Sequence, residues 1–214
     1  MVVNNDANME ALRNCGAIPA LLALSQDTVS EDVQQRAIWC ISNMLVSEDN
    51  HHAVIEAGGL GVIISKLSSS NQGILTLCAD ALANITQFDD FIRMEIGSLG
   101  AIPLLLNLIS ITKTKPMNTD AELKEHVMRA LVNLAHNSDN EEKMLASGAI
   151  PLLVNYLALG VSENFQRYAI MILVNLSLNE KVRIAIRIAG GLSLAAILLC
   201  NLNVFEEGNR EFTF

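Results

Sequence analysis

Four asparagines recur along this chain of 214 residues, each at the end of an apolar helical run. They are Asn43, Asn84, Asn133 and Asn175, and they lie 41, 49 and 42 positions apart. A side-chain amide both donates and accepts hydrogen bonds, so it can pair with the N–H and C=O groups of an extended peptide, whatever that peptide's sequence. The alternative use is structural, with each amide bonding a neighbouring backbone and shaping the array of helices. Recognition of a polypeptide main chain is therefore the chemistry that these residues offer.

A second row of residues lies four positions before each asparagine, one helical turn away on the same face. The row is chemically mixed and consists of Trp39, Asp80, Arg129 and Met171. An indole face beside a carboxylate suits a Lys or Arg side chain, whereas Arg129 suits an acidic one. The two rows together predict a surface that prefers a peptide of mixed charge to a uniformly basic peptide.

A glycine signal runs in phase with the asparagines and defines the elements that must position them. Gly16, Gly58, Gly100, Gly148 and Gly190 are 42, 42, 48 and 42 positions apart. A fixed period near 42 predicts a solenoid. Each period holds a short first helix stopped by the glycine, a nearly all-apolar second helix that is expected to be buried, and a longer third helix. Polar signals such as Ser30-Glu31-Asp32 and Ser162-Glu163-Asn164 are expected to cap third helices.

The period divides the chain into four full repeats, a partial fifth and a tail. The solenoid is predicted over residues 1–203, with repeats at about 8–48, 49–88, 89–138, 139–178 and a partial one at 179–203, and residues 204–214 form a non-repeat tail. The third repeat carries about six extra residues around 111–120, which are expected to form a surface loop. Apolar residues at matching phases are predicted to be core: Leu21, Leu22, Leu105, Leu131, Leu152 and Leu173.

These phrases resemble a known family. The sequence Gly16-Ala17-Ile18-Pro19 before a Leu-rich helix, followed by a third helix that ends at Asn43, resembles the armadillo repeat, and the resemblance covers roughly residues 8–202. It implies an all-α, right-handed α-solenoid of three-helix repeats, here four full repeats plus a partial fifth. It also implies that the third helices line a concave groove that binds extended peptides. The leading interpretation is therefore a non-enzymatic scaffold that binds an extended segment of another protein.

Two alternatives stay open. Trp39 with Asn43 matches the Trp-x-x-x-Asn pair with which importin-α holds basic nuclear-localisation peptides, so an importin-α-like adaptor is one of them. In that family the Trp recurs in consecutive repeats, whereas this chain has one Trp and places Arg129 at an equivalent position. The other alternative is a regulatory solenoid within a larger multidomain protein, for example one with ankyrin repeats.

Composition narrows the classes of partner. The net charge of −9 argues against nucleic acid, because phosphate binding requires clustered Lys and Arg. The four cysteines have no CxxC spacing and indicate thiols in a reducing compartment, so a cytoplasmic or nuclear location is expected. The uncharged stretch 188–205 fits a second helix of the repeat better than a membrane span. The histidines lack ligand spacing, so we expect no metal, cofactor or catalytic residue, and uncapped solenoid ends would permit self-association.

Overall fold

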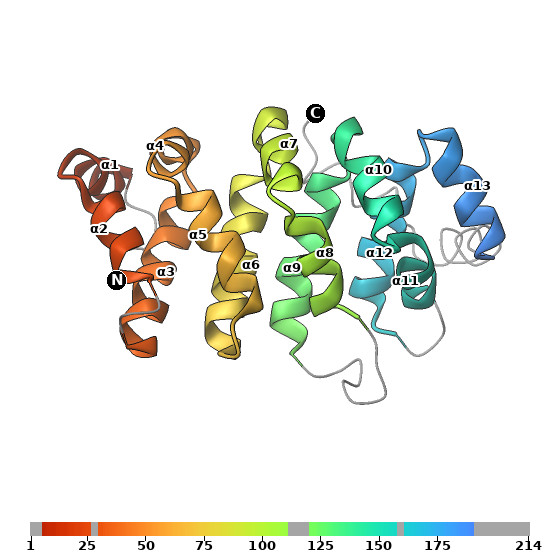
Figure 1. The fold of residues 1–214 in the computed structure, drawn as a ribbon, viewed down its shortest axis with the longest axis horizontal. Coiled ribbons are helices and arrows are strands. Elements are labelled where there is room, and N and C mark those ends of the chain that lie inside the picture. Colours follow the sequence, from red (N-terminus) through yellow and green to blue (C-terminus); the bar gives the residue numbers. More distant parts are fainter. Residues whose placement is uncertain (1–5, 27–29, 111–119, 158–160, 191–214) are drawn as a thin grey trace.

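The computed structural model describes residues 6–26, 30–110, 120–157 and 161–190, and within these ranges every regular element is helical. The elements follow one another along a single axis from α1 to α13 (Figure 1). The first helices are α1 (Asp6–Asn14), α4 (His51–Glu56, after the short 3₁₀ turn η1 at Glu48–Asn50), α7 (Asp90–Ser98), α10 (Ser138–Ala146) and α13 (Glu180–Ile188). The second helices are α2 (Ala17–Leu24), α5 (Gly59–Ser65, continued by η2 at Lys66–Ser68), α8 (Ala101–Leu108) and α11 (Ala149–Tyr156). The third helices are α3 (Glu31–Met44), α6 (Gln72–Ile85), α9 (Ala121–Leu134) and α12 (Glu163–Leu176).

The predicted α-solenoid is confirmed. Helices α1–α3, α4–α6, α7–α9 and α10–α12 form four successive groups of three, and α13 begins a fifth. In Figure 1 the first helices gather along the upper edge and the third helices stand side by side below them. The second helix predicted for the fifth repeat, the tail at 204–214 and most of the loop predicted at 111–120 lie outside the described residues.

The glycine that ends each first helix takes a left-handed backbone conformation, as predicted. The φ angles of Gly16, Gly58, Gly100, Gly148 and Gly190 lie between 76 and 82°. A residue with a Cβ is strained in this region, whereas glycine is not. The chain therefore turns sharply at this glycine and begins the second helix immediately. Proline is tolerated in the first turn of that helix because the N–H groups there have no helical partner.

The third helices begin at the predicted polar residues, but the caps differ from the expectation. Ser30 and Ser162 occupy the N-cap positions of α3 and α12 without any side-chain cap hydrogen bond. By contrast, Asn71 caps α6, because its side chain accepts a hydrogen bond from the backbone N–H of Ile74 at 3.2 Å. The first helix α7 is also capped, since Asp89 accepts from the N–H of Phe91 at 2.7 Å.

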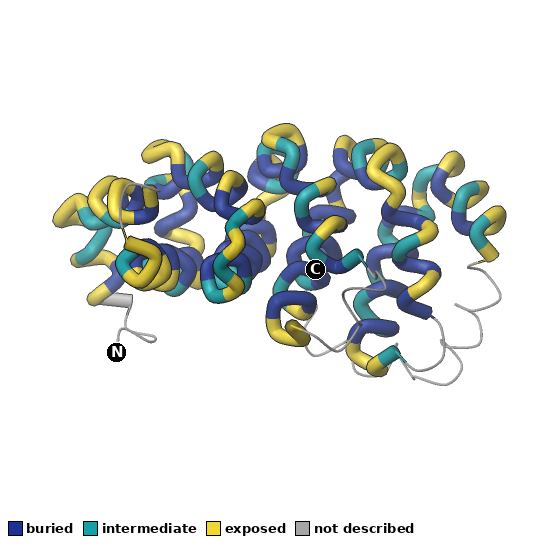
Figure 2. The backbone as a smooth tube through the Cα atoms, turned by 60° about the horizontal axis from the view of Figure 1, so that its bottom comes forward, coloured by how far each residue is buried: buried dark blue, intermediate teal, exposed yellow. Residues whose placement is uncertain are grey.

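The core runs along the solenoid axis (Figure 2). It is built mainly from the second and third helices, and each first helix adds one or two buried residues. Four of the six predicted core leucines are buried, namely Leu22, Leu105, Leu131 and Leu173. The other two, Leu21 and Leu152, are only half-buried. In α11 the fully buried leucine is Leu153, one position and therefore about 100° further around the helix. Leu21 has the phase of Leu105, but α2 packs mainly on α1 and α3, whereas α8 is also covered by η2 and α10.

The cysteines of the described residues are free thiols in three environments. Cys78 is fully buried, and burial raises its pKa to about 12. Cys40 is half-buried and Cys15 is exposed. Cys78 therefore lies in the core, while Cys40 reaches only its margin.

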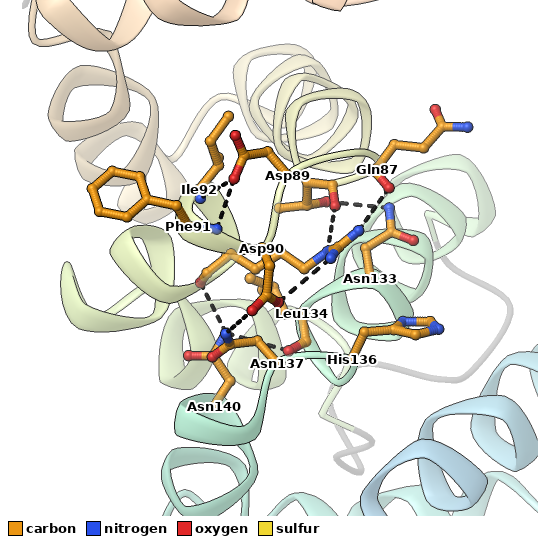
Figure 3. A network of polar contacts seen from close by, with 12 residues as sticks. Gln87, Asp89, Asp90, Phe91, Ile92, Asn133, Leu134, His136, Asn137 and Asn140 are labelled. Atoms are coloured by element: carbon orange, nitrogen blue, oxygen red, sulfur yellow. Dashed lines mark hydrogen bonds and ion pairs between the residues drawn. The ribbon is translucent and has the colours of Figure 1, made fainter. Parts of the chain in front are cut away.

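A buried polar network joins consecutive repeats at the edge where third helices lead into first helices (Figure 3). Asn140 is fully buried and donates through Nδ2 to the carbonyls of Arg93 at 2.8 Å and Leu134 at 3.2 Å. Arg93 in turn donates to the carbonyl of Thr86 at 2.8 Å at the end of α6. Gly97 leaves space for Asn140, because a Cβ on this glycine would overlap the asparagine Oδ1 and lie 2.7 Å from its Cγ. The bonds to Thr86 and Leu134 satisfy carbonyls at the ends of α6 and α9, and the bond of Asn140 to the carbonyl of Arg93 joins α10 to α7.

No single helix in the described ranges has both the length and the apolar composition to cross a membrane. One pair, α7 with α8, passes the test only when the two helices are taken together, and it bends by 81° between them.

Candidate functional site

The four third helices pack side by side and form one surface, which we call the third-helix face. Helix α6 contacts both α3 and α9, and α9 contacts α12. All eight residues predicted for the site lie on these helices, and the four asparagines with Asp80, Arg129 and Met171 are half-buried. Trp39 is more open, with 48% of its surface exposed. The structure therefore places both rows at the partly accessible side of the third helices.

Each asparagine after the first donates a hydrogen bond to the preceding third helix. Asn84 Nδ2 lies 3.5 Å from the carbonyl oxygen of Ser42, and Asn133 Nδ2 lies 3.1 Å from that of Ala83. Asn175 Nδ2 lies 3.4 Å from the carbonyl oxygen of Val132. In every case the acceptor is the residue just before the asparagine of the preceding repeat, so the three contacts form a regular ladder.

The sequence left open whether each amide bonds a neighbouring backbone, and these three contacts show that Asn84, Asn133 and Asn175 do so. This bond does not consume the whole amide, because an asparagine has two N–H donors and a carbonyl acceptor. All three bonds to the preceding helix run through Nδ2, so they make no use of Oδ1. The amides are thus held in a set orientation by the neighbouring repeat before any ligand arrives.

Asp80 in the second row lies within a group of polar side chains from three helices. Ser42 of α3 donates its hydroxyl to Asp80 Oδ2. From α9, His126 Nδ1 lies 3.2 Å from Asp80 Oδ1, and a guanidinium nitrogen of Arg129 lies 3.9 Å from the same oxygen. Asp80 and Arg129, which the sequence treated as separate selectors, are therefore brought together, with the side chain of Arg129 38% exposed.

Two histidines belong to this face, although the sequence gave them no part in peptide binding. His126 stands beside Asp80, and His136 lies next to the fourth asparagine, with its Nδ1 3.3 Å from Asn175 Nδ2. Their positions in the sequence could have predicted this, because His126 precedes Asn133 by two helical turns and His136 follows it by almost one. Histidines at these offsets share the face of the asparagine.

The third-helix face is hollowed beside Trp39. This hollow, which we call the side pocket, has a volume of about 570 Å³. Its lining comes from the N-terminal halves of α3 and α6 and from the first turn of α9: Asp32, Gln35, Arg36, Trp39, Gln72, Gly73, Thr76, Leu77 and Glu122. Trp39 is the only one of the eight predicted residues in this lining, so the pocket extends the site beyond the two rows.

The histidines and acidic residues of the described ranges do not gather around a metal site. No group of three or more His, Cys, Asp and Glu side chains there is arranged to hold a metal ion. A place at the start of a first helix predicts a solvent edge for His51, but the side chain is buried: it is 3% exposed and its Nε2 lies 2.9 Å from the carbonyl oxygen of Leu45. His52 is exposed and pairs with Glu56 at 3.2 Å.

Comparison with known sequences agrees with this architecture. Residues 5–46 match the family model described as Armadillo/beta-catenin-like repeat. The U-box domain-containing protein 18 of Arabidopsis thaliana is 28% identical over 197 residues, which cover 90% of this chain and 27% of that protein. Importin subunit alpha-1b of Oryza sativa subsp. japonica is 26% identical over 176 residues, which cover 74% of this chain and 32% of that protein. The chain thus spans less than a third of the length of these relatives.

Solved structures share the fold over nearly the whole chain. An engineered protein superposes with a TM-score of 0.84 at 25% identity, over 97% of this chain and 82% of its own. A designed armadillo repeat protein in complex with the peptide (KR)4 superposes with a TM-score of 0.83 at 23% identity, over 96% of this chain and 84% of its own.

Proposed function

Because this chain is an armadillo-repeat protein, we propose that it is a non-enzymatic scaffold that binds an extended segment of another protein along the third-helix face. The backbone of the segment would lie over Asn43, Asn84, Asn133 and Asn175, and its side chains would meet Trp39, Asp80, Arg129 and Met171. The partner would be found in the cytoplasm, the nucleus or both. A designed armadillo repeat protein of the same fold is known in complex with a peptide, which supports this mode of binding.

The single observation that carries the proposal is the asparagine ladder. Packed helices lie ~10 Å apart and an extended chain advances ~3.3 Å per residue, so one asparagine per repeat meets the peptide about every third residue. Each amide after Asn43 is oriented by the preceding helix and keeps its Oδ1 out of those bonds. A group that is ordered before binding loses less conformational entropy when the ligand arrives.

The charges of the second row favour a mixed peptide over a polybasic one. Arg129 approaches Asp80 only to 3.9 Å and is partly exposed, so an acidic side chain of the partner has a cation to pair with. A lysine at the same place would be repelled by Arg129 and would have to compete with it for Asp80. The mixed row therefore supports a scaffold with its own sequence preference.

Two other functions keep specific support. The Trp39–Asn43 pair and the similarity to importin subunit alpha-1b favour an adaptor for basic nuclear-localisation peptides. The matched residues cover less than a third of each relative, which favours a solenoid that regulates a larger protein. The first of these differs from the scaffold in the peptide that it should prefer.

Calorimetric titration of the full chain with the peptides (ER)4 and (KR)4 tests the proposal. We expect (ER)4 to bind more tightly, and Asn84→Ala and Asn133→Ala each to weaken it about three- to tenfold, because main-chain hydrogen bonds are lost. Asn107→Ala is the matched control, since Asn107 is an exposed asparagine on the second helix α8.

Two results would count against the scaffold as proposed. If (KR)4 bound more tightly than (ER)4 despite the positive charge of Arg129, the nuclear-transport adaptor would be favoured. If Asn84→Ala and Asn133→Ala left the affinity for both peptides unchanged, binding along the third-helix face would be abandoned in favour of a convex or end-on interface.

A further inference from the structure

We propose that a second interaction surface lies on the edge formed by the first helices, and that it binds a basic amphipathic helix of another protein. The surface, which we call the aromatic edge, consists of Phe88 and Phe91 beside the helices α4 and α7. It lies outside both predicted rows of the third-helix face and goes beyond the proposed function.

Phe88 is an extra residue at the junction between the second and third repeats. Asn84 and Gly100 are 16 positions apart, whereas the corresponding asparagine and glycine are 15 positions apart in the other three pairs. The insertion falls between the end of α6 and the N-cap of α7, where Phe88 lies. The centroid of its ring is 6.3 Å from that of His51 in α4, and 51% of its surface is exposed. The insertion therefore places an aromatic ring next to α4 without burying it.

Phe91 is the more open of the two rings, with 63% of its surface exposed. It lies nine residues before Gly100, and Lys181 has the same position relative to its own glycine. Lys181 reaches back to the preceding first helix, where its Nζ lies 2.7 Å from Glu142 Oε1. The same position in α7 directs Phe91 toward α4. Figure 3 shows its ring pointing away from the polar network around Asn140.

The two rings are not needed to complete the core of this region. Val54 of α4 and Ile92 and Ile96 of α7 supply the buried apolar residues, and each is 4% exposed or less. Exposed aromatic rings commonly anchor a partner, because each buries a large apolar area in the complex. Phe88 and Phe91 are therefore available to a partner while the two helices keep their own packing.

The charges beside the aromatic edge favour a basic partner. The segments 48–57 and 89–99 together carry six carboxylates, which are Glu48, Asp49, Glu56, Asp89, Asp90 and Glu95. Arg93 is the one Lys or Arg in these segments, and its side chain is only 14% exposed and donates to the carbonyls of Thr86 and Gln87. By contrast, α13 carries Lys181, Arg183 and Arg187 against Glu180. The edge at α4 and α7 therefore attracts Lys and Arg side chains and repels acidic ones.

The shape of the partner follows from the way in which this edge is built. Helix α7 packs closely against α10, whereas α4 and α7 do not pack closely on one another. Figure 1 shows α4 and α7 as successive first helices along the upper edge. A helix that is added here extends the helix-on-helix packing of the edge. Its apolar stripe would cover the two rings, and its Lys and Arg side chains would face the carboxylates.

Fluorescence anisotropy of labelled peptides with the full chain tests the aromatic edge. The probes are the basic helix (LKKLLKL)2, the acidic helix (LEELLEL)2 and a lysine homopolymer of the same length, which has the charge but no apolar stripe. We expect (LKKLLKL)2 to bind about tenfold or more tightly than either of the other two.

Matched variants locate the binding. Phe88→Ala and Phe91→Ala should each weaken (LKKLLKL)2 about three- to tenfold, because each removes an aromatic anchor. Leu178→Ala is the control for a lost apolar side chain, since Leu178 is 81% exposed at the end of α12. Glu56→Gln should weaken binding about two- to threefold, and Glu10→Gln, an exposed glutamate on α1, controls for the change in net charge.

The outcomes separate this inference from the proposed function. Equal binding of (LKKLLKL)2 and the acidic helix, or of (LKKLLKL)2 and the lysine homopolymer, would overturn the choice of partner. Wild-type affinity in both Phe variants would overturn the surface, as would displacement of (LKKLLKL)2 by unlabelled (ER)4. Loss of affinity in Phe88→Ala and Phe91→Ala, with Leu178→Ala and the binding of (ER)4 unchanged, would support it.

Discussion

Two sets of asparagines in this solenoid use the same amide chemistry in opposite surroundings. At the junctions near the first helices, Asn50 and Asn140 are fully buried and donate to the carbonyls of Met44 and Leu134. On the third-helix face, Asn84, Asn133 and Asn175 donate to carbonyls of the preceding repeat but stay half-exposed. Both sets tie helices together, and burial alone decides whether an asparagine can also meet a partner.

The difference is visible in what surrounds each amide. Asn140 fills the space that Gly97 leaves. Its Nδ2 donates to two carbonyls and its Oδ1 accepts from Lys143 Nζ at 3.3 Å, so the whole amide is used within the protein. Asn84 makes its bond to Ser42 beside a face that is hollowed a few residues away. The buried asparagines at the junctions therefore fix the spacing between repeats. The third-helix face depends on that spacing, because its amides bond the preceding helix.

The largest expected effect comes from adding one methyl group at a junction. Gly97→Ala places a Cβ against Asn140, which cannot move without losing two hydrogen bonds, so we expect a loss of roughly 1–3 kcal/mol in the free energy of unfolding. Urea unfolding measures this. Gly61→Ala is the matched control, because a Cβ on that helical glycine meets no atom within 4 Å, and the change should be neutral or stabilising by up to about 1 kcal/mol. Equal behaviour of the two variants would contradict the role of Gly97.

The same truncation in the two sets of asparagines should have opposite consequences. Asn140→Ala removes two hydrogen bonds from a fully buried place and should cost roughly 1–3 kcal/mol of stability. Asn133→Ala should cost less, about 0.5–1.5 kcal/mol, because Asn133 is half-exposed and the carbonyl of Ala83 keeps the hydroxyl of Thr86, 3.4 Å away, as a donor. Peptide binding should respond in the reverse order, with Asn133→Ala the more damaging. A stability loss as large for Asn133 as for Asn140 would remove the distinction between spacer and clamp.

The smallest effect concerns a single buried hydroxyl between the third and fourth repeats. Tyr156 donates to the carbonyl of Ile109 at 2.6 Å, and Tyr156→Phe should cost about 0.5–1.5 kcal/mol. Burial raises the pKa of Tyr156 to about 12 from an ordinary value of 10.0. The unfolded chain thus releases this proton first, so the free energy of unfolding should fall as pH rises from about 10 to about 12. In Tyr156→Phe this part of the pH dependence should be absent, and an unchanged pH profile would contradict it.

The sequence by itself determined the parts of this protein that depend on local geometry. The five in-phase glycines established the stop of each first helix, since their positive φ values follow from the absence of a Cβ. The four asparagines and their partners one turn earlier were assigned to one helix face, and the structure places all eight on the third helices. The predicted burial of Leu105 and Leu131 is confirmed. In α11 the prediction was one residue too early, because Leu153 is buried and Leu152 points closer to the surface.

Only the tertiary structure decided which side chains from different repeats meet. The bond of each asparagine to the preceding helix, the group of Ser42, His126 and Arg129 around Asp80, and the side pocket over Gly73 all join third helices that follow one another. Periodicity states which residues share a face. It carries no information on the offset and rotation between stacked repeats, because these are set by side-chain packing across the helix interfaces.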